Sequence, residues 1–162
     1  MNNRIFRQIA FFAAVGVLGG LFARNRAVYN AENTLLLPVE IASVVQKGAE
    51  KTVRLRYRTL IPPSAVSESG GKILVSKDGI GAVSFLSVYD PAKPLRTREY
   101  VLKYSIVYDK GVPAVRFGRT SLTVPAGTKE NKAAYAVVKA DKDGRTALIG
   151  LADKNGRAVK PM

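Results

Sequence analysis

The stretch TVRLRYRTL, residues 52–60, alternates side chains of two kinds without interruption. Successive residues of a β-strand point to opposite faces, so this alternation predicts a strand with one buried and one exposed face. The buried face would carry Val53, Leu55, Tyr57 and Thr59. The exposed face would carry Arg54, Arg56 and Arg58.

Most of the chain after residue 50 continues this pattern of strands joined by turns that contain glycine. The expected strand pairs are 72–76 with 80–88, 99–108 with 112–117, and 135–140 with 145–152. Turns rich in Asp, Lys and Gly separate the members of each pair, and in the first turn Gly79 would supply the positive φ. We therefore expect a mainly β fold, an antiparallel meander or sandwich-like domain, with one short helix over residues 129–136.

An internal similarity links two of these hairpins. KDGIGAVSFL at residues 77–86 resembles KDGRTALIGL at residues 142–151, with glycine, alanine and leucine at matching places. The similarity indicates either a repeated hairpin or the general likeness of hairpins to one another.

The N-terminal region contains the apolar segment IAFFAAVGVLGGLFA, residues 9–23, between pairs of arginines. As a helix it would cover roughly 22 Å of a hydrocarbon layer about 30 Å thick, a length that suits a membrane anchor or a signal peptide. No small-x-small cleavage site follows, which favours an uncleaved anchor. We expect a single transmembrane helix within residues 1–26, a linker at 27–33 and a β-rich extracytoplasmic domain at 34–162.

Glycines inside the apolar segment suggest a helix contact. Gly16 and Gly20 form a GxxxG pair with Gly19 beside it, and small residues at this spacing let a second helix approach closely. The alternative is that glycine is simply common in membrane helices. Basic residues flank both ends of the segment, so the orientation rests on the usual placement of a short N-terminal end in the cytoplasm.

The composition excludes several kinds of catalytic site. The chain has no His and no Cys, so it has no ordinary catalytic triad, no thiolate nucleophile and no zinc site of the usual ligands. Aspartates sit in glycine turns, where they bond their own backbone, and we expect no metal and no cofactor. A Ser–Lys dyad needs no His; Ser76 with Lys77 and Ser105 with Lys103 are the nearest pairs. These pairs lack the surrounding motifs of such hydrolases, so we predict a non-catalytic protein.

Positive charge is the main functional signal. The chain has 26 Lys and Arg against 12 Asp and Glu, and removing four anchor arginines leaves 22 against 12, a net charge of +10. Arg54, Arg56 and Arg58 would lie roughly 7 Å apart on one face, and Arg96 and Arg98 repeat the spacing in a loop. Such a row repels itself unless an anion lies opposite, so these five arginines predict an anionic-partner face. The alternative is an ordinary solvated sheet face.

Nucleic acid is not an expected partner, because the chain has no recognition helix and no RNA-binding signature. Tyr100, Tyr104 and Tyr108 are not a stacking platform in our interpretation. They share one strand face with Leu102 and Ile106 and are expected to lie in the core.

The order of these elements resembles a family of membrane-anchored bacterial proteins named for a GDYxxLxY motif. The resemblance covers residues 34–160, including LLLPVEIASVVQKGAEKTVRLRYRT, YVLKYSIVYDKGVPAVRFGRTSL and AAYAVVKADKDGRTALIGLADKNGRAVKP. Leu55 and Tyr57 correspond to the Leu-x-Tyr end of the signature, and QKGAEKTV stands where Gly-Asp-Tyr is expected. The resemblance implies a periplasmic β-domain on the bacterial inner membrane, in some cases encoded with multi-pass membrane proteins, and it implies no established activity.

Taken together, these patterns predict a non-catalytic accessory or structural subunit of a membrane or cell-envelope assembly. It would dock through its transmembrane helix and its basic β-domain, with membrane lipid and other membrane-protein subunits as partners and with possible homo-oligomer formation. A first alternative is an envelope module that binds anionic lipid headgroups or polyanions. A second alternative is a Ser–Lys hydrolase.

Overall fold

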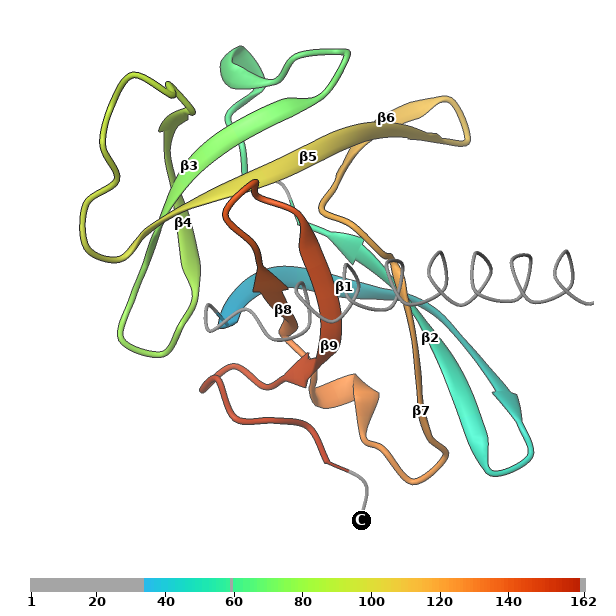
Figure 1. The fold of residues 1–162 in the computed structure, drawn as a ribbon. Coiled ribbons are helices and arrows are strands. Elements are labelled where there is room, and N and C mark those ends of the chain that lie inside the picture. Colours follow the sequence, from blue (N-terminus) through green and yellow to red (C-terminus); the bar gives the residue numbers. More distant parts are fainter. Residues whose placement is uncertain (1–33, 59, 161–162) are drawn as a thin grey trace, which may run out of the picture.

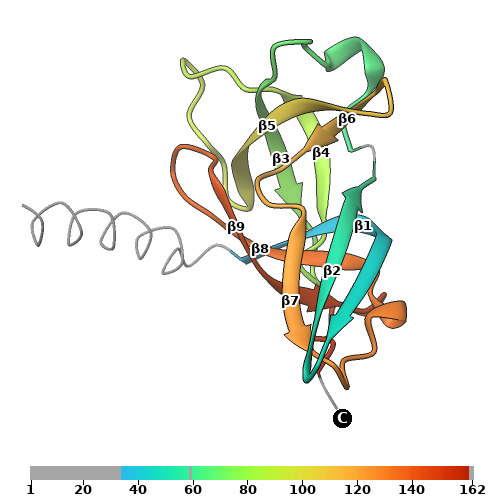
Figure 2. The same cartoon turned by 90° about the vertical axis from the view of Figure 1, so that its right-hand side faces the viewer.

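A computed structural model of the protein describes residues 34–58 and 60–160. This part of the chain is mainly β, with nine strands and only two single 3₁₀ turns (Figures 1 and 2). The elements are β1 (Thr34–Lys47), β2 (Glu50–Tyr57), η1 (Pro63–Ala65), β3 (Gly71–Lys77), β4 (Val83–Val88), β5 (Glu99–Asp109), β6 (Val112–Arg116), β7 (Ser121–Pro125), η2 (Glu130–Lys132), β8 (Tyr135–Ala140) and β9 (Thr146–Ala152).

The strands form two antiparallel sheets. The five-stranded sheet has the order β7-β2-β1-β8-β9 and combines the two ends of the described chain. The four-stranded sheet has the order β4-β3-β5-β6 and contains the middle of the chain. Figure 1 shows the four-stranded sheet above the strands of the other sheet, with the β1–β2 hairpin projecting from the lower part. The expected mainly β, antiparallel and sandwich-like fold is therefore confirmed for these residues, while the strand orders differ from those of a simple meander.

One hydrophobic core connects the two sheets. Its fully buried side chains come from both, including Leu35, Val53, Ile73 and Leu102. Phe117, in the connection between β6 and β7, is 1% exposed and packs edge-on against the Tyr57 ring, with ring centroids 5.6 Å apart. Burial of this apolar surface is the main term that stabilises the arrangement.

Strand β2 follows the predicted alternation. Its burial alternates residue by residue, with Val53, Leu55 and Tyr57 buried and the arginines between them exposed. Thr59 lies outside the described residues. The sequence pattern was sufficient here because one face of β2 meets the core and the other meets solvent.

The expected helix over residues 129–136 is wrong. The structure has one 3₁₀ turn, Glu130–Lys132, and strand β8 already begins at Tyr135. Two strands were also missed, β1 and β7. Leu35, Leu36 and Leu37 of β1 are all buried, so this strand shows no alternation. Leu36 contributes to the outer side of the sheet, where loops around Gly81 and Gly156 cover it.

Three turns in the structure have the same hydrogen bonds. In the loops that start at Asp78, Asp141 and Asp153, the aspartate N–H donates to the carbonyl oxygen four residues later, and its Oδ1 accepts backbone N–H groups of the same loop. The internal similarity is therefore structural, but Asp78 corresponds to Asp141, two residues away from the predicted register. The positive φ lies at Gly81, at 98°, and not at Gly79 as expected.

The predicted membrane anchor (1–26), the linker (27–33) and the proposed helix-contact residues Gly16, Gly19 and Gly20 lie outside the described residues. Within residues 34–58 and 60–160, no helix has the length and apolar character needed to cross a membrane.

Candidate functional site

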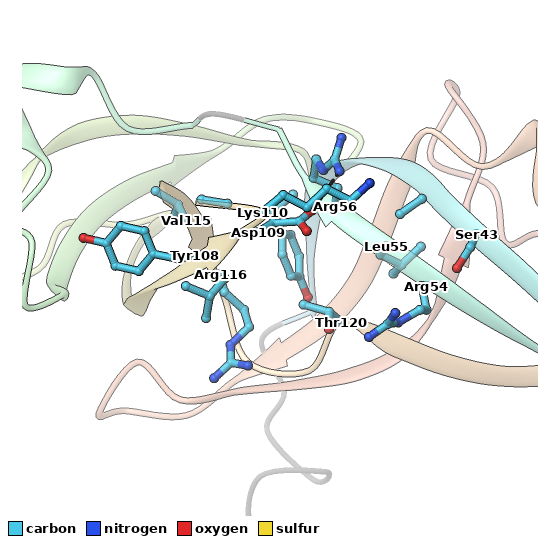
Figure 3. A pocket seen from close by; sticks show the side chains of 14 residues that line it. Ser43, Arg54, Leu55, Arg56, Tyr108, Asp109, Lys110, Val115, Arg116 and Thr120 are labelled. Carbon is cyan, nitrogen blue, oxygen red and sulfur yellow. Dashed lines mark hydrogen bonds and ion pairs between the residues drawn. The ribbon is translucent and has the colours of Figure 1, made fainter. Parts of the chain in front are cut away.

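A groove runs between β2 and the β5–β6 hairpin and consists of two adjoining cavities. The first has a volume of about 440 Å³, and we call it the basic compartment because Arg54, Arg56, Lys110 and Arg116 line it (Figure 3). The second has a volume of about 760 Å³, and we call it the apolar compartment. Its apolar walls are Ile61, Pro63, Val66, Ile106, Val112, Pro113 and Val115.

Local structure explains why the basic side chains meet. Arg54 and Arg56 lie on the exposed face of β2 because the alternate residues enter the core. Lys110 lies in the two-residue turn of the β5–β6 hairpin, where Lys110 and Gly111 both have positive φ, at 51° and 82°. Such a turn matches the twist of its two strands and holds the hairpin tip in a defined place. Arg116, at the end of β6, completes the set.

The charge of the basic compartment is strongly unbalanced. Four basic side chains line it with one carboxylate, that of Asp109. Arg56 Nη2 donates to Asp109 Oδ2 at 2.9 Å, and both side chains are about half exposed. Among the described residues, no carboxylate lies within 4 Å of the charged groups of Arg54, Lys110 or Arg116. Three positive charges in this hollow thus have no counter-ion within the described part of the protein.

The Arg56–Asp109 ion pair stands between the two compartments. Both residues line both cavities, and Figure 3 shows Asp109 and Lys110 beside Arg56. Half-exposed ion pairs of this kind stabilise a protein by only about 0–1 kcal/mol, because water screens them. The ion pair at the boundary between the two compartments is therefore weak.

Tyr57 contributes to the walls of both compartments from the buried side. Its hydroxyl donates to the carbonyl oxygen of Arg119 at 2.8 Å. Burial raises the pKa of the Tyr57 phenol, and the positive charge of Arg116 acts in the opposite direction. The phenol therefore stays protonated at neutral pH and acts as a fixed donor to the β6–β7 connection.

The apolar compartment is electrically balanced. Its basic residues, Arg56 and Lys110, are matched by two carboxylates, those of Asp109 and Glu68. Large side chains at its mouth are open to solvent, with Tyr108 68% and Val112 64% exposed. Tyr108 was predicted to lie in the core with Tyr100 and Tyr104, and this is wrong, because the end of β5 extends beyond the core.

The structure separates the five arginines of the predicted anionic-partner face. Arg54 and Arg56 line the groove, while Arg58 Nε lies 3.3 Å from Glu40 Oε1 on β1. Arg96 and Arg98 precede the start of β5, whereas Asp109, which lines the groove, ends this 11-residue strand. Roughly 35 Å of extended chain therefore separates the two arginines from the groove. Arg96 and Arg98 do not belong to the groove. Arg116 and Lys110 line the groove instead, and the pairing of β5 with β6 is what brings these two residues together.

The two candidate Ser–Lys pairs lie on β3 and β5 of the four-stranded sheet. Lys103 on β5 is exposed, two residues from Ser105. Lys77, next to Ser76, donates from Nζ to the Thr34 carbonyl oxygen at 3.4 Å and lies 5.1 Å from the centroid of the Tyr100 ring. The Lys77 ammonium is thus engaged by a carbonyl oxygen and an aromatic face.

A buried lysine that the sequence did not signal lies elsewhere. Lys51, 8% exposed, forms a hydrogen-bonded ion pair with Glu130 in η2, and this hydrogen bond lowers the pKa of the Glu130 carboxyl. The pair connects β2 to the turn before β8. No cluster of metal-ligating side chains is found in the described part of the chain.

The groove is thus an open hollow with a cationic half and an apolar half. Its geometry suits the binding of a ligand that carries negative charge beside apolar surface. In comparisons with known proteins, no family model, no curated protein and no solved structure matches this chain.

Proposed function

We propose that the protein is a non-catalytic, membrane-anchored accessory subunit of a bacterial cell-envelope assembly. Its β-domain would bind an acidic surface of a partner membrane protein through the basic compartment. The observation that carries this proposal is the concentration of four basic side chains around a single carboxylate in one hollow.

Electrostatics supports an anionic partner. Like charges in a concave site repel one another and focus the field, so an acidic surface is attracted to the site and relieves the repulsion on binding. The arginines also provide planar groups that bind carboxylates through two parallel hydrogen bonds. The surrounding strands fix the backbone positions from which these side chains extend, so binding has to order the side chains but not the backbone.

The anchor and its orientation belong to the proposal on sequence grounds. The apolar segment at residues 9–23 would span the inner membrane once and place residues 34–160 in the periplasm. Gly16, Gly19 and Gly20 would provide a second contact with the partner, or with a second copy, inside the membrane.

The test is extraction of the native protein in mild detergent, followed by size-exclusion chromatography and mass spectrometry of the proteins that elute with it. A stoichiometric partner is expected with the wild-type chain. The double variant Arg54→Gln/Arg116→Gln should lose this partner, and the matched variant Arg96→Gln/Arg98→Gln, with the same change in net charge, should retain it. All four arginines are exposed, so each substitution should change folding stability by only about 0.5 kcal/mol.

A monomer without any partner would contradict the subunit proposal. Loss of the partner in both variants would show that net charge matters and the groove does not. Steep salt-dependent binding to anionic vesicles, weakened by the Arg54/Arg116 variant, would favour the alternative of a module that binds lipid headgroups or polyanions.

A further inference from the structure

We propose that the whole groove binds an extended acidic segment of the partner protein, in which one carboxylate replaces Asp109 on Arg56 and a neighbouring apolar side chain enters the apolar compartment. This inference rests on the proposed function and specifies the chemistry of the bound segment. Asp109 would then be a built-in competitor that the ligand displaces.

The arrangement of charge gives the first argument. The basic compartment carries four basic groups and one carboxylate, whereas the apolar compartment carries two of each. The two share Arg56, Asp109 and Lys110, so one ligand can reach both. A segment with acidic residues at one end and apolar residues at the other matches this order along the groove.

The position of Asp109 gives the second argument. Its Oδ2 accepts a hydrogen bond from Arg56 Nη2 at 2.9 Å, at the boundary between the two compartments that such a ligand must cross. The carboxylate comes from the last residue of β5, beside the two-residue turn, and it is 54% exposed. When a ligand carboxylate replaces that of Asp109, Arg56 is paired both before and after binding. Breaking the weak internal ion pair therefore adds only a small free-energy cost to binding.

The groove suits a peptide better than an acyl chain. Its apolar half is open, with Tyr108 and Val112 mostly exposed at the mouth, so an acyl chain there would leave much of its surface in water. In addition, β6 is an edge strand of its sheet, and its outer edge can accept hydrogen bonds from an extended backbone, although Pro113 has no N–H to donate there.

The test uses the full chain in detergent and a fluorescein-labelled peptide, Ser-Asp-Asp-Leu-Val-Leu-Ser, with fluorescence anisotropy as the readout. Asp109→Asn should lower the Kd of this peptide about threefold to fivefold, because the competing carboxylate is lost. Arg56→Gln should raise the Kd by about fivefold or more. The control Asp90→Asn makes the same charge change in the 89–98 loop and can keep the Oδ1 bond to Ala92 N–H, so it should leave the Kd nearly unchanged.

Two further peptides test the two halves separately. Replacing both Asp by Asn, or the three apolar residues by Ser, should each weaken binding. Equal tightening by Asp109→Asn and Asp90→Asn, or indifference to the apolar residues, would overturn the inference. Tighter binding by Asp109→Asn to phosphatidylglycerol vesicles, without a change for the peptide, would also overturn it and assign the groove to lipid. If the wild-type chain binds the peptide as expected but no partner elutes with it after detergent extraction, the proposed function alone is contradicted.

Discussion

The ammonium group of Lys51 on β2 binds the carboxylate of Glu130 in η2, and the two residues are 79 positions apart in the sequence. The lysine side chain is 9% exposed and that of the glutamate is 21% exposed. The pair holds the turn before β8 against the five-stranded sheet. Because the lysine is the more deeply buried partner, the two residues are not equivalent in their effect on stability.

Glu130→Gln should destabilise the protein more than Lys51→Met does. The first change leaves a buried ammonium without its counter-charge, at a cost of about 1–3 kcal/mol in the free energy of unfolding. The second removes the buried charge and leaves a carboxylate that water can reach. Thermal unfolding followed by circular dichroism would measure both, and equal destabilisation by the two variants would contradict this account.

The same pair predicts a loss of stability in acid. The hydrogen bond from Lys51 lowers the pKa of the Glu130 carboxyl below its ordinary value of 4.5. A lowered pKa in the folded state stabilises the fold fully above the unfolded pKa, and this contribution is lost as the pH falls through the folded pKa. The stability difference between wild type and Glu130→Gln should therefore be constant at neutral pH and shrink below pH 4.5. A difference independent of pH down to the folded pKa would show that the ion pair contributes nothing.

Asp78→Ala should destabilise the β3–β4 hairpin, whereas Asp78→Asn should have little effect. Oδ1 of Asp78 accepts three backbone N–H groups, those of Ile80, Gly81 and Ala82, at 2.9–3.0 Å. Asparagine retains this acceptor and alanine does not, so alanine should cost about 1–2 kcal/mol. Hydrogen exchange of the 80–82 amides would locate the effect, and equal protection in both variants would argue against it.

Gly118→Ala should be much more damaging than Gly48→Ala. Both glycines have positive φ, at 71° and 60°, a conformation that costs an L-residue roughly 1–2 kcal/mol. A Cβ at position 118 would also lie 2.6 Å from Thr146 Oγ1 and 3.0 Å from the Thr146 carbonyl oxygen, whereas nothing lies within 4 Å at position 48. The difference in unfolding temperature between the two variants measures the steric part alone. A smaller loss at position 118 than at position 48 would contradict the close contact.

The strands that sequence patterns identified are those with one buried face. β2 alternates because its arginines meet solvent, and the glycine turns marked most of the hairpins correctly. β1 was missed because loops 78–82 and 153–157 bury Leu36 on the side opposite Leu35 and Leu37. The 129–136 segment has helical composition, but pairing of β8 with β1 and β9 overrides this local preference.

The candidate site was predictable only in part. The sequence placed Arg54 and Arg56 on an exposed face, and they line the groove. It also grouped Arg96 and Arg98 with them, but these two do not line the groove. The repeated spacing could not show this, because a spacing in a loop says nothing about the distance to a strand in another sheet. Asp109, the carboxylate opposite Arg56, lies 53 residues away in sequence, and no local pattern relates the two.

The sequence by itself determined the β character of the domain, the outward arginines of β2, the positive charge and the absence of His and Cys chemistry. These properties follow from local alternation and composition. The tertiary structure alone decided which arginines share a groove, which carboxylate opposes them and where an apolar cavity adjoins them. The physical reason is that the groove is built from β1, β2, the 61–68 segment and the β5–β6 hairpin, which only the packing of two sheets on one core brings together.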